Sequence, residues 1–171
     1  MNSEIDAIIR HLKDKYNNLD TSNFNILDFL GPIGSPLDAL IYARLFWPTF
    51  IEIQGMVFRE ETVDGNDGII EVTNALARFN GDRQKTEKSF NLVEVPSSIF
   101  GRNIEETTEL ENHLLAVTLC EMWRARLHVA FPTRSFEVNV CQPDQTGGDV
   151  GVVFFSRNSN DPQGGSATVT Q

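Results

Sequence analysis

One apolar stretch of sequence decides the fold: LLAVTLCEMWRARLHVA, at residues 114–130. Its apolar side chains recur on most sides of a helix, and Pro132 stops the helix soon after. Upstream, Asn103 with Glu106 three residues later forms a capping pair, so the sequence predicts a helix over residues 104–130. A helix that is apolar on most sides is normally surrounded by the rest of the domain. We therefore expect this helix at the centre of the fold.

Shorter helices are expected before the central one. Apolar residues repeat at helical spacing over residues 4–17, after a serine cap. A Ser-Pro pair opens a helix over 36–46, and a second repeat over 69–79 ends at an Asn-Gly stop. The charged stretch 82–91 is expected to continue as a short helix.

Four stretches have the character of strands. Alternating or β-branched residues predict them at residues 50–58, 92–95, 136–141 and 150–156, with a bend at Gly55. The last two are separated by a turn and should form an antiparallel hairpin. Because strands and helices do not alternate regularly, the fold class is α+β, a small, mainly antiparallel sheet packed against helices.

Length and composition indicate one domain. The chain has 171 residues, of which 40% are apolar and 22% charged, as in an ordinary globular protein. Residues 157–171 are polar and carry little that can pack, so we expect a globular domain over 1–156 and a flexible tail.

The charge balance restricts the partners. Fourteen Lys and Arg against 24 Asp and Glu give a net charge of −10, and the basic residues form no local stripe. The negative electrostatic field of such a protein repels phosphate backbones and anionic membrane surfaces. We therefore expect no nucleic-acid and no membrane partner, whereas a basic protein is electrostatically favoured.

The cysteines and the chain start favour a cytoplasmic location. Cys120 and Cys141 are not in a C-x-x-C spacing, so both are expected to be free, buried thiols. The first residues are polar and acidic, unlike a secretory signal, and no apolar run is long enough for a membrane span.

Metal and cofactor motifs are missing from the sequence. His113 and His128 are fifteen residues apart and cannot share a metal within one helix, and His11 is expected to be solvated. No His-x₃-His or Cys-x₂-Cys spacing occurs. The acidic tip DGNDG at 64–68 resembles a calcium loop, but its twelfth position is Ala75 instead of Glu. The sequence predicts a turn there, and no metal or cofactor.

Catalysis has one weak candidate. An acid followed by a strand with Glu-x-Lys can hold magnesium in a nuclease, and Asp38 with Glu52 and Gln54 approaches that pattern. Gln54 stands where the lysine is needed, and Asp38 is explained by the first turn of its helix. No nucleophile motif accompanies them, and Cys120 lies in an apolar helix that makes a thiol inert.

The remaining candidates are acidic surfaces. Two clusters flank helix starts, where carboxylates are favourable anyway, but they also suit docking of a basic partner. The hypothesis is a non-enzymatic acidic binding protein acting through a protein–protein interface, of the immunity or inhibitor type. The alternatives are the nuclease-like enzyme and a structural protein that self-associates through a strand edge. The expected docking residues are Glu60, Glu61, Asp64, Asp67, Glu71, Glu105, Glu106, Glu109 and Glu111.

Overall fold

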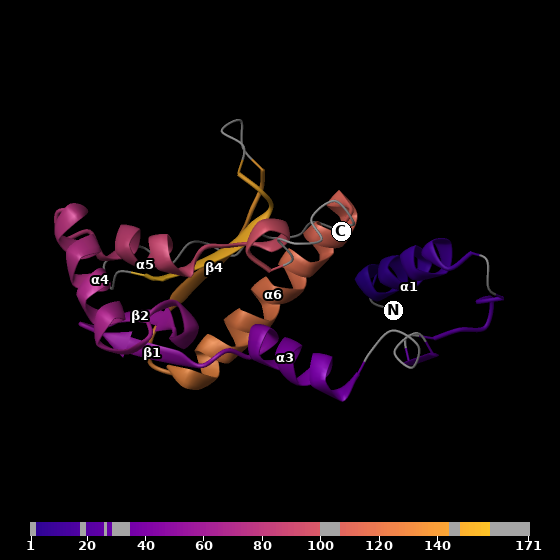
Figure 1. The fold of residues 1–171 in the computed structure, drawn as a ribbon, viewed down its shortest axis with the longest axis horizontal. Helices are drawn as coiled ribbons and strands as arrows, with labels where there is room; N and C mark the ends of the chain where they lie inside the picture. Colours follow the sequence, from indigo (N-terminus) through magenta and orange to yellow (C-terminus); the bar gives the residue numbers. More distant parts are fainter. Residues whose placement is uncertain are drawn as a thin grey trace.

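The computed structural model describes residues 3–17, 20–25, 27–28, 35–99, 107–143 and 148–157. The fold consists of helices and two small antiparallel sheets, which confirms the α+β class (Figure 1). The helices are α1 (Ser3–Lys15), α3 (Pro36–Phe46), α4 (Gly65–Arg78), α5 (Arg83–Asn91) and α6 (Glu109–Ala130), with short turns η1 (Glu60–Thr62) and η2 (Val95–Ile99). The strands are β1 (Phe50–Ile53), β2 (Met56–Arg59), β3 (Val93–Glu94), β4 (Phe136–Cys141) and β5 (Gly151–Ser156).

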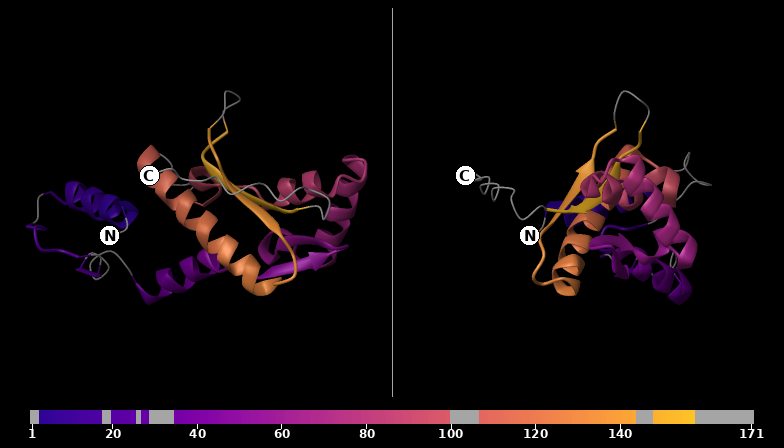
Figure 2. Two further views of the ribbon diagram at one scale, coloured as in Figure 1. Left: turned by 180° about the vertical axis from the view of Figure 1, so that it is seen from behind. Right: turned by 90° about the vertical axis from the view of Figure 1, so that its left-hand side faces the viewer.

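Helix α6 supplies a large part of the core, but one of its faces is open to solvent, with Val129 62% exposed, so it is not surrounded on most sides as its sequence predicts. It packs on an antiparallel sheet of order β3-β5-β4, in which β4 and β5 form the expected hairpin (Figure 2). Trp123 is fully buried, and its ring lies edge-on to Phe154 with 6.1 Å between centroids. The indole Nε1 of Trp123 donates to the carbonyl of Leu45 at 2.8 Å, which anchors the end of α3.

The start of α6 differs from the prediction. Thr108 is the N-cap, and its side chain and that of Glu111 make a reciprocal capping box. The pair Asn103 and Glu106 lies outside the described residues. Two similar capping signals lie five residues apart, so the sequence alone leaves the first residue of this helix ambiguous. The structure places the N-cap of α6 at the second signal, Thr108.

The region 50–58 is a hairpin and not the single strand expected. β1 and β2 pair around the turn Gln54-Gly55, whose φ values of 52° and 76° are both positive. Two-residue hairpins require this left-handed pair, which Asn-Gly signals more clearly than Gln-Gly. Arg83 donates to the Gln54 carbonyl, and Arg134 donates to the Gly55 carbonyl at 2.8 Å, so two arginines hold the turn.

Helix α4 begins earlier than expected. The acidic tip DGNDG at 64–68, predicted as a turn, supplies the N-cap Asp64 and the first turn of α4. Gly68 is buried against the backbone of Val63, where a Cβ atom would overlap. The glycine therefore permits a close approach between helix and η1 and is not part of a cation loop.

Two side chains of α5 join the hairpin to the larger sheet. Glu87, only 1% exposed, accepts from the backbone N–H groups of Val57 on β2 and Ser156 on β5, both at 2.7 Å. One turn later, buried Asn91 donates to the Val57 carbonyl at 2.8 Å and accepts from the Arg59 N–H at 3.4 Å. The facing edges of the two sheets are thus bridged by side chains where no strand lies between them.

The buried carboxylate of Glu87 is stabilised further through Ser156. The Ser156 hydroxyl donates to Glu87 at 2.7 Å and accepts from Arg134 at 2.9 Å. Arg134 also pairs with Glu52 at 3.0 Å. A charged group in the interior needs such partners, because burial without them is costly.

Helix α1 lies at one end of the molecule and α4 at the other (Figures 1 and 2). Glu111 of α6 accepts from His11 at 2.9 Å and from Lys15 at 3.0 Å, which joins α1 to α6. None of the helices in the described residues combines the length and apolar character that crossing a membrane requires. The expected tail, apart from Arg157, is outside the described residues.

Replacing Glu87 tests the bridge between the sheets. Glu87→Leu leaves the Val57 and Ser156 N–H groups buried without an acceptor, so we expect a loss of about 3 kcal/mol or more in the free energy of unfolding. Urea denaturation measures it, with the exposed Glu71→Gln on α4 as control. A Glu87→Leu variant as stable as that control would contradict the role of the bridge.

The attachment of α1 should depend on pH. Burial opposes ionisation of Glu111, but hydrogen bonds from His11, Lys15 and Thr108 outweigh it and lower the pKa from 4.5 to about 2. A lowered folded-state pKa gives stability that is complete above about pH 4.5 and is lost as the pH falls toward 2. Hydrogen exchange in α1 should therefore rise over that window, and should rise less in Glu111→Gln.

Candidate functional site

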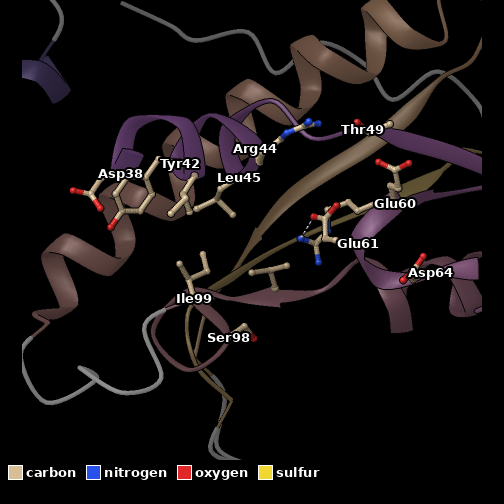
Figure 3. A pocket seen from close by; sticks show the side chains of 13 residues that line it. Asp38, Tyr42, Arg44, Leu45, Thr49, Glu60, Glu61, Asp64, Ser98 and Ile99 are labelled. Atoms are coloured by element: carbon tan, nitrogen blue, oxygen red, sulfur yellow. Dashed lines mark hydrogen bonds and ion pairs between the residues drawn. The ribbon is translucent and has the colours of Figure 1, made fainter. Parts of the chain in front are cut away.

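A groove of about 1000 Å³ lies between α3, the start of α4 and the η2 turn (Figure 3). Its walls come from segments far apart in the sequence, which the Trp123–Leu45 hydrogen bond and the Glu87–Asn91 bridge hold in place. The lining residues are Asp38, Ile41, Tyr42, Arg44, Leu45, Thr49, Arg59, Glu60, Glu61, Asp64, Val93, Ser98 and Ile99.

The α3 side of the groove is apolar and open to solvent. No residue of α3 is buried, although the helix carries Leu, Ile, Tyr and Phe side chains. Ile41 is 59% exposed and Tyr42 is 41% exposed, and both line the groove. Ile99 of η2 lies across the groove from Tyr42 and Leu45 (Figure 3). Exposed apolar side chains gathered beside a groove are typical of a binding surface.

The rim of the groove is acidic. Glu60, Glu61 and Asp64 stand together on one side, and Asp38 stands on the other side, at the start of α3 (Figure 3). All four are exposed. Arg44 and Arg59 are the lining cations among the described residues, and the carboxylates outnumber them by four to two. The site therefore favours a cationic occupant.

Arg59 is the buried cation of the groove. It is 7% exposed, its guanidinium lies 5.0 Å from the Trp123 ring centroid, and Nη1 donates to Glu61 at 2.8 Å. Burial lowers the pKa of Arg59 from its ordinary value, and the charge of Glu61 opposes that effect. Among described residues, Arg59 Nε is the buried side-chain nitrogen or oxygen without a hydrogen-bond partner. A buried donor without an acceptor is unfavourable for folding, so this N–H group is available to a hydrogen-bond acceptor of a bound molecule.

The groove presents apolar surface, four carboxylates and two arginines, with Ser98 and Thr49 as hydroxyls. Within the parts of the chain that the structure describes, no three His, Cys, Asp or Glu side chains are grouped to hold a metal ion.

A second, smaller hollow of about 150 Å³ lies beside the hairpin turn. Arg83, Arg134, Ser156 and Glu87 line it. These side chains hold the turn and the sheet edges through the hydrogen bonds described above. The residues that line this hollow therefore have a structural role, and we assign no binding site to it.

The structure separates the acidic residues that the sequence singled out. Glu60, Glu61 and Asp64 gather at the groove, whereas Asp67 and Glu71 lie on exposed positions of α4 that do not line it. Glu109 and Glu111 lie at the start of α6, toward the end of the molecule opposite α4 (Figure 1). Glu111 is already paired within the chain, and Glu105 and Glu106 are outside the described residues.

The three nuclease candidates are not brought together in one cleft. Asp38 lines the groove and accepts from the Ser35 hydroxyl at 2.7 Å. Glu52 pairs with Arg134, and Gln54 sits in the hairpin turn and donates to Thr73 at 2.9 Å. Neither of these two lines the groove.

Both cysteines are free thiols in the structure, and Cys120 is buried as expected, whereas Cys141 is only half-buried. Burial raises the pKa of Cys120 and of Cys141, which keeps both protonated and unreactive.

Sequence reasoning missed Arg59 and the exposed face of α3. An arginine that ends an apolar strand segment, as in Met-Val-Phe-Arg at 56–59, is a signal for a buried or interfacial charge. The exposure of α3 has no such signal, because its apolar spacing also suits a helix packed on a core.

No protein-family model, no curated protein and no solved structure matches this chain.

Replacing Arg59 by methionine should barely affect stability. The substitution removes a buried charge with an unsatisfied Nε and leaves an apolar side chain against Trp123, which is often neutral or stabilising. We expect the free energy of unfolding to stay within about 1 kcal/mol, whereas Phe58→Ala should lose about 3–5 kcal/mol. A loss with Arg59→Met as large as with Phe58→Ala would show that Arg59 serves the fold.

Proposed function

We propose that this is a non-enzymatic binding protein that docks a basic protein partner in the acidic groove. The observation that carries the proposal is the meeting of exposed apolar side chains, four rim carboxylates and a buried arginine in one groove. A net charge of −10 adds long-range attraction for a cationic partner.

The groove suits a partner segment with a mixed surface. Its apolar side chains would cover Ile41 and Tyr42, and its Lys or Arg side chains would pair with Glu60 and Asp64. A neutral carbonyl oxygen would accept from Arg59, because an added carboxylate would be repelled by the rim. The C-terminal turn of a helix offers free carbonyl groups and basic side chains together, so such a turn is the kind of partner segment that suits the groove.

The finer parts of the proposal are a cytoplasmic location and an inhibitory role. In the reducing cytoplasm Cys120 and Cys141 remain thiols, as the structure has them. A small acidic protein that covers a basic surface would neutralise a toxin or nuclease that needs that surface. Inhibition of the captured partner's activity would test this part separately.

Capture with charge-reversed variants tests the groove. The immobilised full chain should capture a basic partner in stoichiometric amount from an extract of the native host at low salt concentration. Glu60→Lys with Asp64→Lys should weaken that complex at least about tenfold, because two attractive charges become repulsive while the Arg59–Glu61 pair is kept. Calorimetry with the purified partner gives the affinity and its salt dependence.

The matched control is Asp67→Lys with Glu71→Lys. It changes the net charge by the same amount on α4, outside the groove lining. Equal weakening by both double variants would show a general charge effect. Unchanged binding by the groove variant, or recovery of no stoichiometric partner, would refute the proposed site.

A further inference from the structure

One face of α3 carries an apolar stripe that no part of the described chain covers, and Ile41 of this stripe also lines the groove. Leu37, Leu40 and Ile41 stand at helical spacing i, i+3 and i+4, and they are 66%, 69% and 59% exposed. Figure 1 shows α3 along an edge of the molecule, with its opposite side toward α6. The side chains that pack on the core are those of Leu45 and Phe46 near its end.

The charges of α3 are arranged for pairing with a copy of itself. Its two charged residues are Asp38 in the first turn and Arg44 in the last turn, and both are exposed. Arg44 continues the apolar stripe, since it lies seven residues, about 10 Å, beyond Leu37. An antiparallel second α3 would set each Arg44 beside the other copy's Leu37 and Asp38.

We propose that α3 is a homodimer contact, in which two copies pack their α3 helices antiparallel about a two-fold axis. Leu40 and Ile41 of each copy interleave at the centre, and the Arg44 stem covers Leu37 of the second copy. The Arg44 guanidinium pairs with Asp38 of the second copy, and the axis repeats that pair. Such a contact is self-complementary and closes at two copies.

Antiparallel packing also aligns the helix dipoles favourably, because the C-terminal end of each α3 meets the N-terminal end of the other. The contact is small, so the dimer should be weak and concentration-dependent. It uses helix α3 and so differs from self-association through a strand edge. It does not rest on the proposed partner, but Asp38, Ile41 and Arg44 also line the groove, so a bound partner and a second copy would compete for α3.

Light scattering on the purified full chain tests the oligomeric state without any partner. The dimer fraction should rise from micromolar to millimolar protein concentration. Leu40→Glu should abolish it, and the control Ile70→Glu, at a position on α4 that is 57% exposed, should leave it unchanged. A chain that stays monomeric over the whole range would overturn the proposal.

A charge swap tests the pairing itself. Asp38→Arg and Arg44→Asp should each weaken the homodimer about tenfold, because like charges then face each other. Mixing the two single variants should restore dimers as a heterodimer, since both facing pairs become opposite in sign. Failure of the mixture to associate, while both variants give wild-type circular dichroism, would rule out this geometry.

The result is distinguishable from that of the partner experiment. Loss of self-association leaves the groove proposal standing if Glu60→Lys with Asp64→Lys still impairs partner capture. Conversely, a homodimer observed with the purified chain would support the α3 contact even if no basic protein partner is found.

Discussion

The polar bridge from α5 is the interaction on which the rest of the structure depends. β3 pairs only with the first residues of β5, so the outer edge of β5 beyond Val152 needs another partner. The outer edge of β2 faces it. Glu87 and Asn91 fill the space between them with hydrogen bonds to both, and they fix the position of the hairpin relative to the sheet. Because Arg59 ends β2 and donates its N–H to Asn91, the same bridge sets the base of the groove.

The local signals of the sequence predict most of the elements. Ser35-Pro36 and Asn80-Gly81 set the start of α3 and the end of α4, since capping and left-handed turns depend on neighbouring residues alone. The apolar residues of α6 predict its large share of the core, but not that one face of the helix stays exposed. The errors lie where a local pattern was ambiguous: the Gln54-Gly55 turn, the glycine-containing tip at 64–68 that begins α4, and the two capping signals before α6.

The candidate site could be predicted only in part. The sequence indicates acidic residues at Glu60, Glu61 and Asp64, but Asp38 reaches the same groove only through the packing of α3. Glu87 lies in a polar stretch that looks solvated, and its burial results from contacts 30 and 69 residues away in the chain. Such long-range contacts leave no periodicity in the sequence. For the same reason the sequence does not predict the burial of Arg59, whose guanidinium lies against the Trp123 ring, 64 residues away in the chain.

The groove and the proposed homodimer contact share part of α3. Asp38, Ile41 and Arg44 line the groove, and the same three side chains belong to the contact proposed for a second copy. Docking of a basic partner and self-association would therefore compete for this helix. A helix held to the core mainly by its last residues and the Leu45 carbonyl leaves these side chains accessible.

The dependence of the fold on the α5 bridge is tested most directly by amide hydrogen exchange at Val57 and Ser156. Both N–H groups point away from their strand partners and reach only the Glu87 carboxylate. If the bridge holds the sheets together, both amides exchange only with global unfolding, as slowly as the central amides of α6. Exchange at the rate of exposed loop amides, with α6 still protected, would contradict the bridge and the groove built on it.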